Sequence, residues 1–231
     1  MVNVMFAGPS GIGKTTTAKW LIDAQVVNGV FISGSVSDLI PKTKELSHKD
    51  MLDRDSKTLQ MEDYQVVNLR NKAYKSSMEQ GTDFVTDRSY LDSAAYFTYK
   101  QAKTIPQCEL EHFLELNKML LCQQCTHLVV FDFTPKMIKE WVMEDNDKRI
   151  MNKYFQFEIS VLMKSLLKVW GCNLAHQDTL KKNWLVSNVL KDGYDIGKIK
   201  SIYGDVQVIC IQEANLDIRK RIITQFINGK I

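Results

Sequence analysis

Residues 8–15 constrain this chain more than any other segment, because they read Gly-Pro-Ser-Gly-Ile-Gly-Lys-Thr and fill every fixed position of the pattern GxxxxGK[ST]. A short apolar run at residues 2–7 precedes the pattern, and helix-compatible sequence at residues 16–24 follows it. The chain must therefore turn sharply from a strand into a helix. The three glycines allow backbone conformations closed to other residues and leave no Cβ above the turn.

Such a turn is typical of a site for a nucleoside triphosphate. Backbone N–H groups and the positive end of the helix dipole face the β-phosphate. Lys14 adds a full charge toward the β- and γ-oxygens, and the Thr15 hydroxyl can ligate Mg²⁺. The predicted cofactors are therefore ATP and Mg²⁺. The residues predicted to bind them are Gly8, Ser10, Gly11, Ile12, Gly13, Lys14, Thr15 and Thr16.

The composition is that of an ordinary globular protein, with 45% hydrophobic and 25% charged residues. A net charge of +3 neither implies nor excludes a nucleic-acid partner. The odd number of cysteines, five, indicates reduced thiols and a cytoplasmic protein. Cys122 and Cys125 lack the second pair that a zinc site needs. No run reaches the roughly 20 apolar residues of a membrane span, so no membrane partner is expected.

Strand-like and helix-like segments alternate along the chain, which predicts an α/β domain spanning residues 1–231 with a parallel sheet between two layers of helices. The expected strands cover residues 2–7, 30–33, 84–86, 127–133 and 206–211. The expected helices cover residues 16–24, 56–80, 91–102, 108–122, 148–170 and 216–227. Arg219 and Arg221 of the last helix are predicted to coat its surface, with a place beside an adenine pocket as the alternative.

Residues 172–204 interrupt this alternation, because they separate a helix from its expected strand by more than the usual few residues. The segment carries several lysines, among them Lys181 and Lys182, together with Trp184. We expect a helical insertion packed on the sheet edge. A contact with substrate or nucleic acid is the alternative.

A second cluster of functional residue types follows the strand at residues 84–86. Asp87 ends that strand, at the edge of an open α/β sheet where ligands bind. Its carboxylate can hold Mg²⁺ directly or through water, and Arg88 can lie along the phosphates. Asp87 and Thr15 are therefore the predicted metal ligands.

Residues 86–96, Thr-Asp-Arg-Ser-Tyr-Leu-Asp-Ser-Ala-Ala-Tyr, resemble the Asp-Arg motif of thymidylate kinases and of the phage-type proteins in the broader thymidylate-kinase-like P-loop group. The resemblance covers most of the chain except residues 172–204. It implies a P-loop NTPase sandwich with a helical lid near residues 139–149, in which Arg149 is catalytic. It also implies that Arg70, Arg88 and Tyr96 contact the acceptor, and it is compatible with a homodimer.

Two departures from the family concern the acceptor side. Residues 33–41 replace the Glu-Pro-Gly-Gly loop of thymidylate kinases, and the lid keeps only Lys148 and Arg149 of its basic residues. The resemblance therefore predicts kinase chemistry better than it predicts the substrate.

The nature of the acceptor depends on which residues face it. A hydroxyl acceptor benefits from a carboxylate that takes its proton, and Asp38 follows the second expected strand, where related deoxynucleoside kinases keep such a base. A phosphate acceptor is already ionised and needs cations, which Arg70 and the basic residues Lys42, Lys44 and Arg54 supply. Both alternatives stay open at this point.

The sequence thus predicts an ATP- and Mg²⁺-dependent kinase acting on a thymidine-like deoxynucleotide. The acceptor is either a free nucleotide or nucleoside, or the 5-hydroxymethyl group of hydroxymethyluracil in DNA, as for the phage kinases that the chain resembles. A P-loop ATPase switch that drives a partner protein is the alternative, but it needs a water-activating residue that the sequence does not indicate. The predicted catalytic residues are Lys14, Asp38, Asp87, Arg88 and Arg149.

Overall fold

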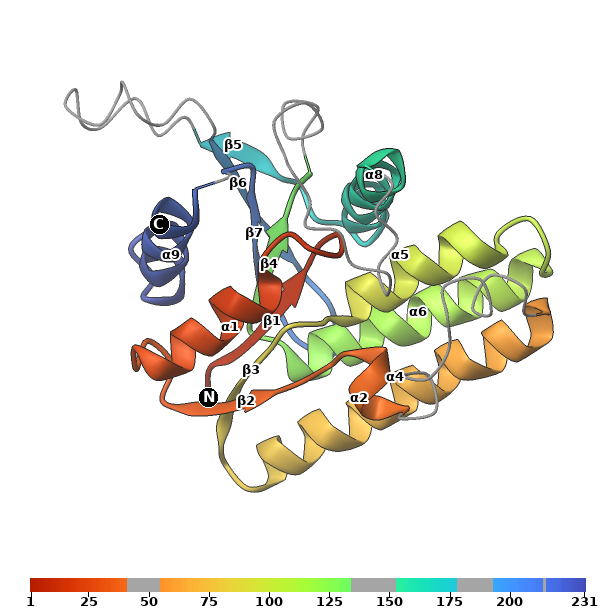
Figure 1. Cartoon of the computed structure of the whole chain (residues 1–231), viewed down its shortest axis with the longest axis horizontal. Helices are drawn as coiled ribbons and strands as arrows, with labels where there is room; N and C mark the ends of the chain where they lie inside the picture. Colours follow the sequence, from red (N-terminus) through yellow and green to blue (C-terminus); the bar gives the residue numbers. More distant parts are fainter. Residues whose placement is uncertain (41–54, 134–152, 178–192, 214) are drawn as a thin grey trace.

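The computed structural model describes residues 1–40, 55–133, 153–177, 193–213 and 215–231. These residues form an α/β fold in which one sheet lies between two layers of helices (Figure 1). The strands are β1 (Asn3–Ala7), β2 (Gly29–Ile32), β3 (Asp83–Thr86), β4 (His127–Phe131), β5 (Ala175–Gln177), β6 (Tyr194–Ile199) and β7 (Val206–Ile211). The helices are α1 (Lys14–Asp23), α2 (Val36–Leu39), α4 (Ser56–Glu79), α5 (Tyr90–Gln101), α6 (Gln107–Gln124), α8 (Lys153–Val169) and α9 (Leu216–Ile227).

The sheet is mixed, which corrects the prediction of an all-parallel sheet. Its strand order in the described residues is β2-β3-β1-β4-β7-β6-β5, and the first five strands are parallel. β6 runs antiparallel to β7, and β5 antiparallel to β6. A short connection at residues 200–205 joins β6 to β7, and such a connection permits only antiparallel pairing, because a parallel crossover needs a dozen or more residues.

The segment at residues 172–204 is therefore not the helical insertion that the sequence predicted, as far as the structure describes it. Its described part contributes β5 and β6, which extend the sheet beyond β7 (Figure 1). Lys181, Lys182 and Trp184 lie outside the described residues.

The side chains of β1 alternate between the two layers of helices. Val4 and Phe6 belong to the apolar core shared with α1 and α9, whereas Met5 and Ala7 belong to the core shared with α4, α5, α6 and α8. Every residue of β1 is buried. A central parallel strand covered on both faces is expected to be almost continuously apolar, and after Asn3 this strand is.

Most expected helices are confirmed. The helices predicted at residues 56–80, 91–102, 108–122 and 216–227 match α4, α5, α6 and α9 to within two residues at either end. Capping explains where they begin: the Asp55 carboxylate accepts the Thr58 N–H at 2.9 Å, and the Asn215 side chain caps α9. No helix in the described ranges is long and apolar enough to cross a membrane.

Candidate functional site

The loop at residues 8–13 joins β1 to α1, so the strand–turn–helix context predicted for the glycine-rich pattern is confirmed. Gly8, Gly11 and Gly13 have φ angles of 144°, 79° and 91°, which L side chains rarely adopt. A Cβ on Gly8 would also lie 2.8 Å from the backbone oxygen of Phe131, at the end of β4. Steric constraints in the folded chain therefore explain why these positions are occupied by glycine.

Lys14 begins α1 and folds its side chain back over the loop. Its ammonium group donates to the backbone oxygens of Gly8 at 2.5 Å and Pro9 at 2.7 Å, and the side chain is only 5% exposed. Carbonyl oxygens and phosphate oxygens are similar acceptors for an ammonium group. The Lys14 charge is thus held over the loop, where a bound phosphate would meet it.

Thr15 and Asp87, the two predicted metal ligands, lie together. The Thr15 hydroxyl donates to one Asp87 carboxylate oxygen at 2.6 Å, and the Gly34 N–H donates to the other at 3.0 Å. Asp87 is 4% exposed, and it follows β3, which is adjacent to β1 in the sheet. One hydroxyl and one carboxylate suit Mg²⁺, which keeps several waters and takes further oxygens from substrate phosphates.

Ser10 connects the loop to two helices on the opposite side of the sheet from α1. Its N–H donates to the Gln156 side-chain oxygen at 2.9 Å, and its hydroxyl lies 3.3 Å from the Tyr96 hydroxyl and 3.5 Å from an Arg88 nitrogen. Arg88 also pairs with Asp92 at 3.2 Å. Three of the predicted residues, Ser10, Arg88 and Tyr96, therefore meet at one place.

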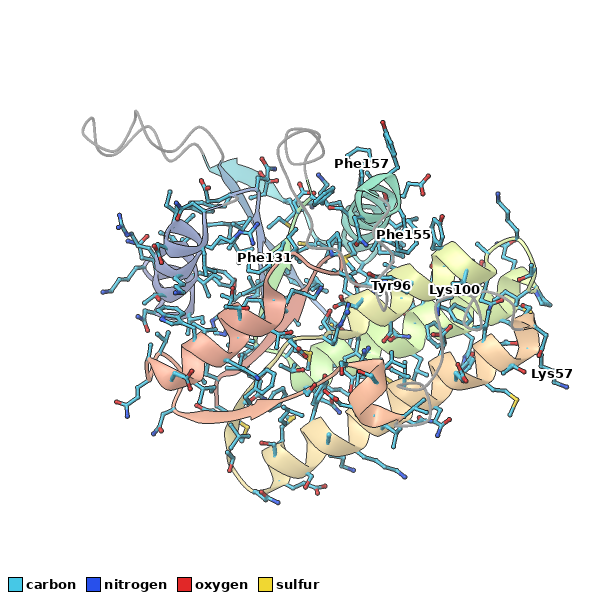
Figure 2. All side chains as sticks on the ribbon, in the orientation of Figure 1. Lys57, Tyr96, Lys100, Phe131, Phe155 and Phe157 are labelled. Atoms are coloured by element: carbon cyan, nitrogen blue, oxygen red, sulfur yellow. The ribbon has the colours of Figure 1, made fainter. Side chains whose placement is uncertain are left out.

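Figure 2 labels Tyr96 on α5 and Phe155 on α8, whose rings lie 6.0 Å apart beside this group. α8 thus approaches α5 next to the loop, and it contributes Gln156 to the contacts of Ser10. Gln156 belongs to none of the motifs recognised in the sequence. Its place between two aromatic residues, Phe155 and Phe157, is the signal in the sequence that could have drawn attention to it.

Arg70, predicted to hold the acceptor, donates hydrogen bonds mainly to backbone oxygens of the chain. The side chain is 3% exposed. Its Nε and Nη2 donate to the Gly34 oxygen at 3.0 and 2.7 Å, and its Nη1 donates to the Ser93 hydroxyl at 2.5 Å. Arg70 therefore fixes the segment after β2 against α5.

Asp38 lies in the short helix α2, just beyond Gly34. It is exposed, and its carboxylate accepts a hydrogen bond from the Ser33 hydroxyl at 2.6 Å. Both groups of the Gly34 backbone are bound, the N–H to Asp87 and the oxygen to Arg70. The backbone at Gly34, which precedes the helix of Asp38, is thereby tethered to Asp87 and Arg70.

Asp132, which directly follows β4, is a buried carboxylate that the sequence analysis did not select. It accepts hydrogen bonds from the Ser160 hydroxyl at 2.6 Å and the Lys164 ammonium at 2.8 Å. Both donors lie on α8, so Asp132 anchors that helix to the sheet. Its place at the end of a strongly apolar strand is the signal that could have found it.

Arg219 was predicted to coat the surface of α9, and this prediction is wrong. The side chain is 2% exposed and lies beneath the loop, where its Nη1 donates to the Ile12 oxygen at 2.6 Å and its Nε donates to the Glu213 oxygen. Its guanidinium lies 4.5 Å from the ring centre of Phe131, which Figure 2 labels. Burial lowers the pKa of Arg219 to about 10, so it remains charged at pH 7.

Several predicted residues cannot be placed. Arg149 and the expected lid at residues 139–149 lie outside the described residues, as do Lys42, Lys44 and Arg54. Among the residues that are described, no group of three or more histidine, cysteine or acidic side chains is arranged to hold a metal ion.

Neither a protein-family model nor a curated protein sequence matches this chain. The function of the chain is therefore inferred from the residues of the site and from the motifs that they form.

Proposed function

We propose that this protein is an ATP- and Mg²⁺-dependent phosphotransferase of the P-loop kinase type. The observation that carries the proposal is the 2.6 Å contact between Thr15 and Asp87 at the start of α1. This contact joins the hydroxyl and the carboxylate that such an enzyme needs for its metal. Both lie beside a glycine-rich loop, and the Lys14 side chain is held over that loop.

The residues of the loop would act by neutralising the charge of the donor phosphates and by positioning them. The backbone N–H groups of the loop and the N-terminus of α1 bind the phosphates of the donor nucleotide. Lys14 exchanges its contacts with the Gly8 and Pro9 oxygens for contacts with phosphate. Thr15 and Asp87 would hold Mg²⁺, which would neutralise negative charge on the phosphates of the donor nucleotide. Arg88, whose Nη2 lies 3.5 Å from the Ser10 hydroxyl, would stabilise the charge of the transferring phosphoryl group.

We further propose that the acceptor group is a hydroxyl. Arg70, the cation expected to bind an acceptor monophosphate, donates hydrogen bonds to the Gly34 oxygen, the Ser93 hydroxyl and the Ser89 oxygen instead. Asp38, in contrast, presents an exposed carboxylate on the segment that Arg70 holds in place. A carboxylate in that position suits removal of a proton from an attacking hydroxyl.

The resemblance of residues 86–96 to the thymidylate-kinase-like group supports a thymidine-like acceptor. It is then either a free nucleoside or nucleotide hydroxyl, or the 5-hydroxymethyl group of hydroxymethyluracil within DNA. We expect Asp38 to serve both cases in the same way, because the reacting group is a hydroxyl in each.

The test is to incubate the protein with Mg²⁺ and γ-labelled ATP and to offer thymidine, dTMP, plain DNA and hydroxymethyluracil DNA separately. Label should enter a hydroxyl-bearing acceptor, and Asp38→Asn should reduce that transfer by about 10²-fold while ATP binding stays unchanged. Asp23→Asn, at the far end of α1, is the matched control and should transfer label normally.

Two results would contradict the proposal. Release of labelled phosphate into water, with none of the acceptors labelled, would indicate an ATPase switch instead of a kinase. Efficient labelling of the dTMP phosphate, with a steep rise in KM for Arg70→Ala and little effect of Asp38→Asn, would place a phosphate in the acceptor position.

A further inference from the structure

Arg219 has no part in the phosphotransfer scheme above, although it is a buried charge directly beneath the loop. It comes from α9, and its Nη1 donates to the Ile12 oxygen at 2.6 Å. The Ile12 side chain is buried in the core between the sheet and α1. Ile12 is therefore held twice, by its side chain through packing and by its carbonyl through a charged donor.

Because the peptide bond is planar, this contact also determines the direction of the Gly13 N–H. In a planar trans peptide, the carbonyl of one residue and the N–H of the next point in opposite directions. Arg219 holds the Ile12 carbonyl toward the core, so the Gly13 N–H is directed away from the core. Gly13 has a φ of 91° and no side chain, so little else in its own structure prevents this peptide from turning over.

The contacts of Arg219 also tie the loop to the segment that follows β7. Its Nε donates to the Glu213 oxygen, and its guanidinium lies over the ring of Phe131. A Cβ placed on Gly13 would lie 3.7 Å from the Arg219 Nη1, which shows how closely the guanidinium approaches the loop. The cation is thus held against the loop and adds positive potential there.

We infer that Arg219 is a positioning residue for the phosphate-binding loop: it locks the Ile12–Gly13 peptide with its N–H facing the phosphates of a bound nucleotide. It does so from behind the loop and without touching the nucleotide. The inference rests on the proposed function, because it takes the ligand of the loop to be a polyphosphate.

The experiment compares Arg219→Met and Arg219→Lys with Arg221→Met, an exposed arginine on the same helix, as the control. Binding of ATP and of inorganic tripolyphosphate, both with Mg²⁺, is measured by calorimetry. Spectra of protein labelled with ¹⁵N-glycine, which contains only 11 glycines, report the Gly13 amide. Circular dichroism and urea unfolding check that each variant is folded.

We expect Arg219→Met to weaken the binding of both ligands at least tenfold and to abolish the change in the Gly13 amide signal that ligand causes in the unaltered protein. Arg219→Lys keeps the charge but not the planar donor pair, so it should give an intermediate affinity. Arg221→Met should bind within twofold of the unaltered protein and show its full Gly13 signal change.

Two kinds of failure are separable. If the unaltered protein binds neither ATP nor tripolyphosphate, the proposed function falls and the inference falls with it. If the unaltered protein binds both, and folded Arg219→Met binds them equally well with the same Gly13 signal change, only the inference is overturned. Should Arg219→Met not fold, Arg219→Lys decides in the same way: weaker binding with an altered Gly13 signal supports the inference, and unaltered behaviour overturns it.

Discussion

Lys14 is the residue whose substitution should reduce the rate of phosphotransfer most strongly. In the proposed function its ammonium group would face the phosphates with a full positive charge, so Lys14→Ala should lower the rate of phosphotransfer by about 10³-fold. Steady-state assays with labelled ATP measure this. Lys19→Ala, an exposed lysine on the same helix, is the control and should keep the normal rate.

Asp87 should determine how the protein responds to Mg²⁺. Asp87→Asn removes the negative charge that would attract Mg²⁺ in the proposed site. It also replaces one acceptor oxygen by a donor, which conflicts with the hydrogen bond from either Thr15 or Gly34. The Mg²⁺ concentration for half-maximal turnover should rise by about 10–100-fold. Asp83→Asn, at the other end of β3, should leave the Mg²⁺ titration unchanged. An unchanged titration for Asp87→Asn as well would mean that Asp87 only supports the loop after β2.

For single residues, the sequence predicted the place of those that belong to a motif better than the place of those whose partners lie far away in the chain. Lys14, Thr15 and Asp87 were predicted because their spacing from glycines and strands sets their place. Arg219 was misassigned, although it lies on the apolar stripe of α9 that includes Ile222, Ile223 and Phe226. Periodicity alone could have shown that its side chain points inward, but not that a loop carbonyl would meet it there.

Among the elements, α5 directly follows Asp87 and Arg88, contains Tyr96, and begins with a reciprocal cap. The Ser89 hydroxyl accepts the N–H groups of Leu91 and Asp92, and the Asp92 carboxylate accepts the Ser89 N–H at 2.9 Å. Ser89→Ala should lower the free energy of unfolding by about 1 kcal/mol, because buried N–H groups lose their acceptor. Urea unfolding measures this change.

The control for the cap is Ser76→Ala, an exposed serine inside α4, which should change the free energy of unfolding by less than about 0.5 kcal/mol. Equal effects of the two substitutions would show that the cap does not stabilise α5.

The elements themselves were predicted where one pattern governed them. α4 and α9 follow helical spacing and have a capping residue, so both ends could be placed. β6 was missed because Asp195, Gly197 and Lys198 dilute its alternation and the segment looked like a lysine-bearing insertion. Its pairing with β7 depends on a contact between strands, which the local sequence does not display.

For the molecule as a whole, burial separates the cysteines. Cys108 is exposed, whereas Cys122, Cys125, Cys172 and Cys210 are buried, and burial raises the pKa of each buried thiol. Because the thiolate is the reactive form, native protein should react rapidly with a thiol reagent at one cysteine and at all five in denaturant. Absorbance of the released reagent counts them.

Cys108→Ser provides the control for this count, and it should remove the rapid reaction of the native protein entirely. Two or more rapidly reacting thiols in the native protein would show that the core around β4 and β7 opens more readily than its burial indicates.

The hydrogen bond between Arg219 and Ile12 joins positions 207 residues apart in the chain. During translation at about 5–20 residues per second, the glycine-rich loop leaves the ribosome about 10–40 s before α9 has been made. Through that interval the Ile12 carbonyl has no guanidinium to hold it. A nascent chain should therefore bind nucleotide poorly, and nucleotide binding would mark the completion of folding instead of guiding its early steps.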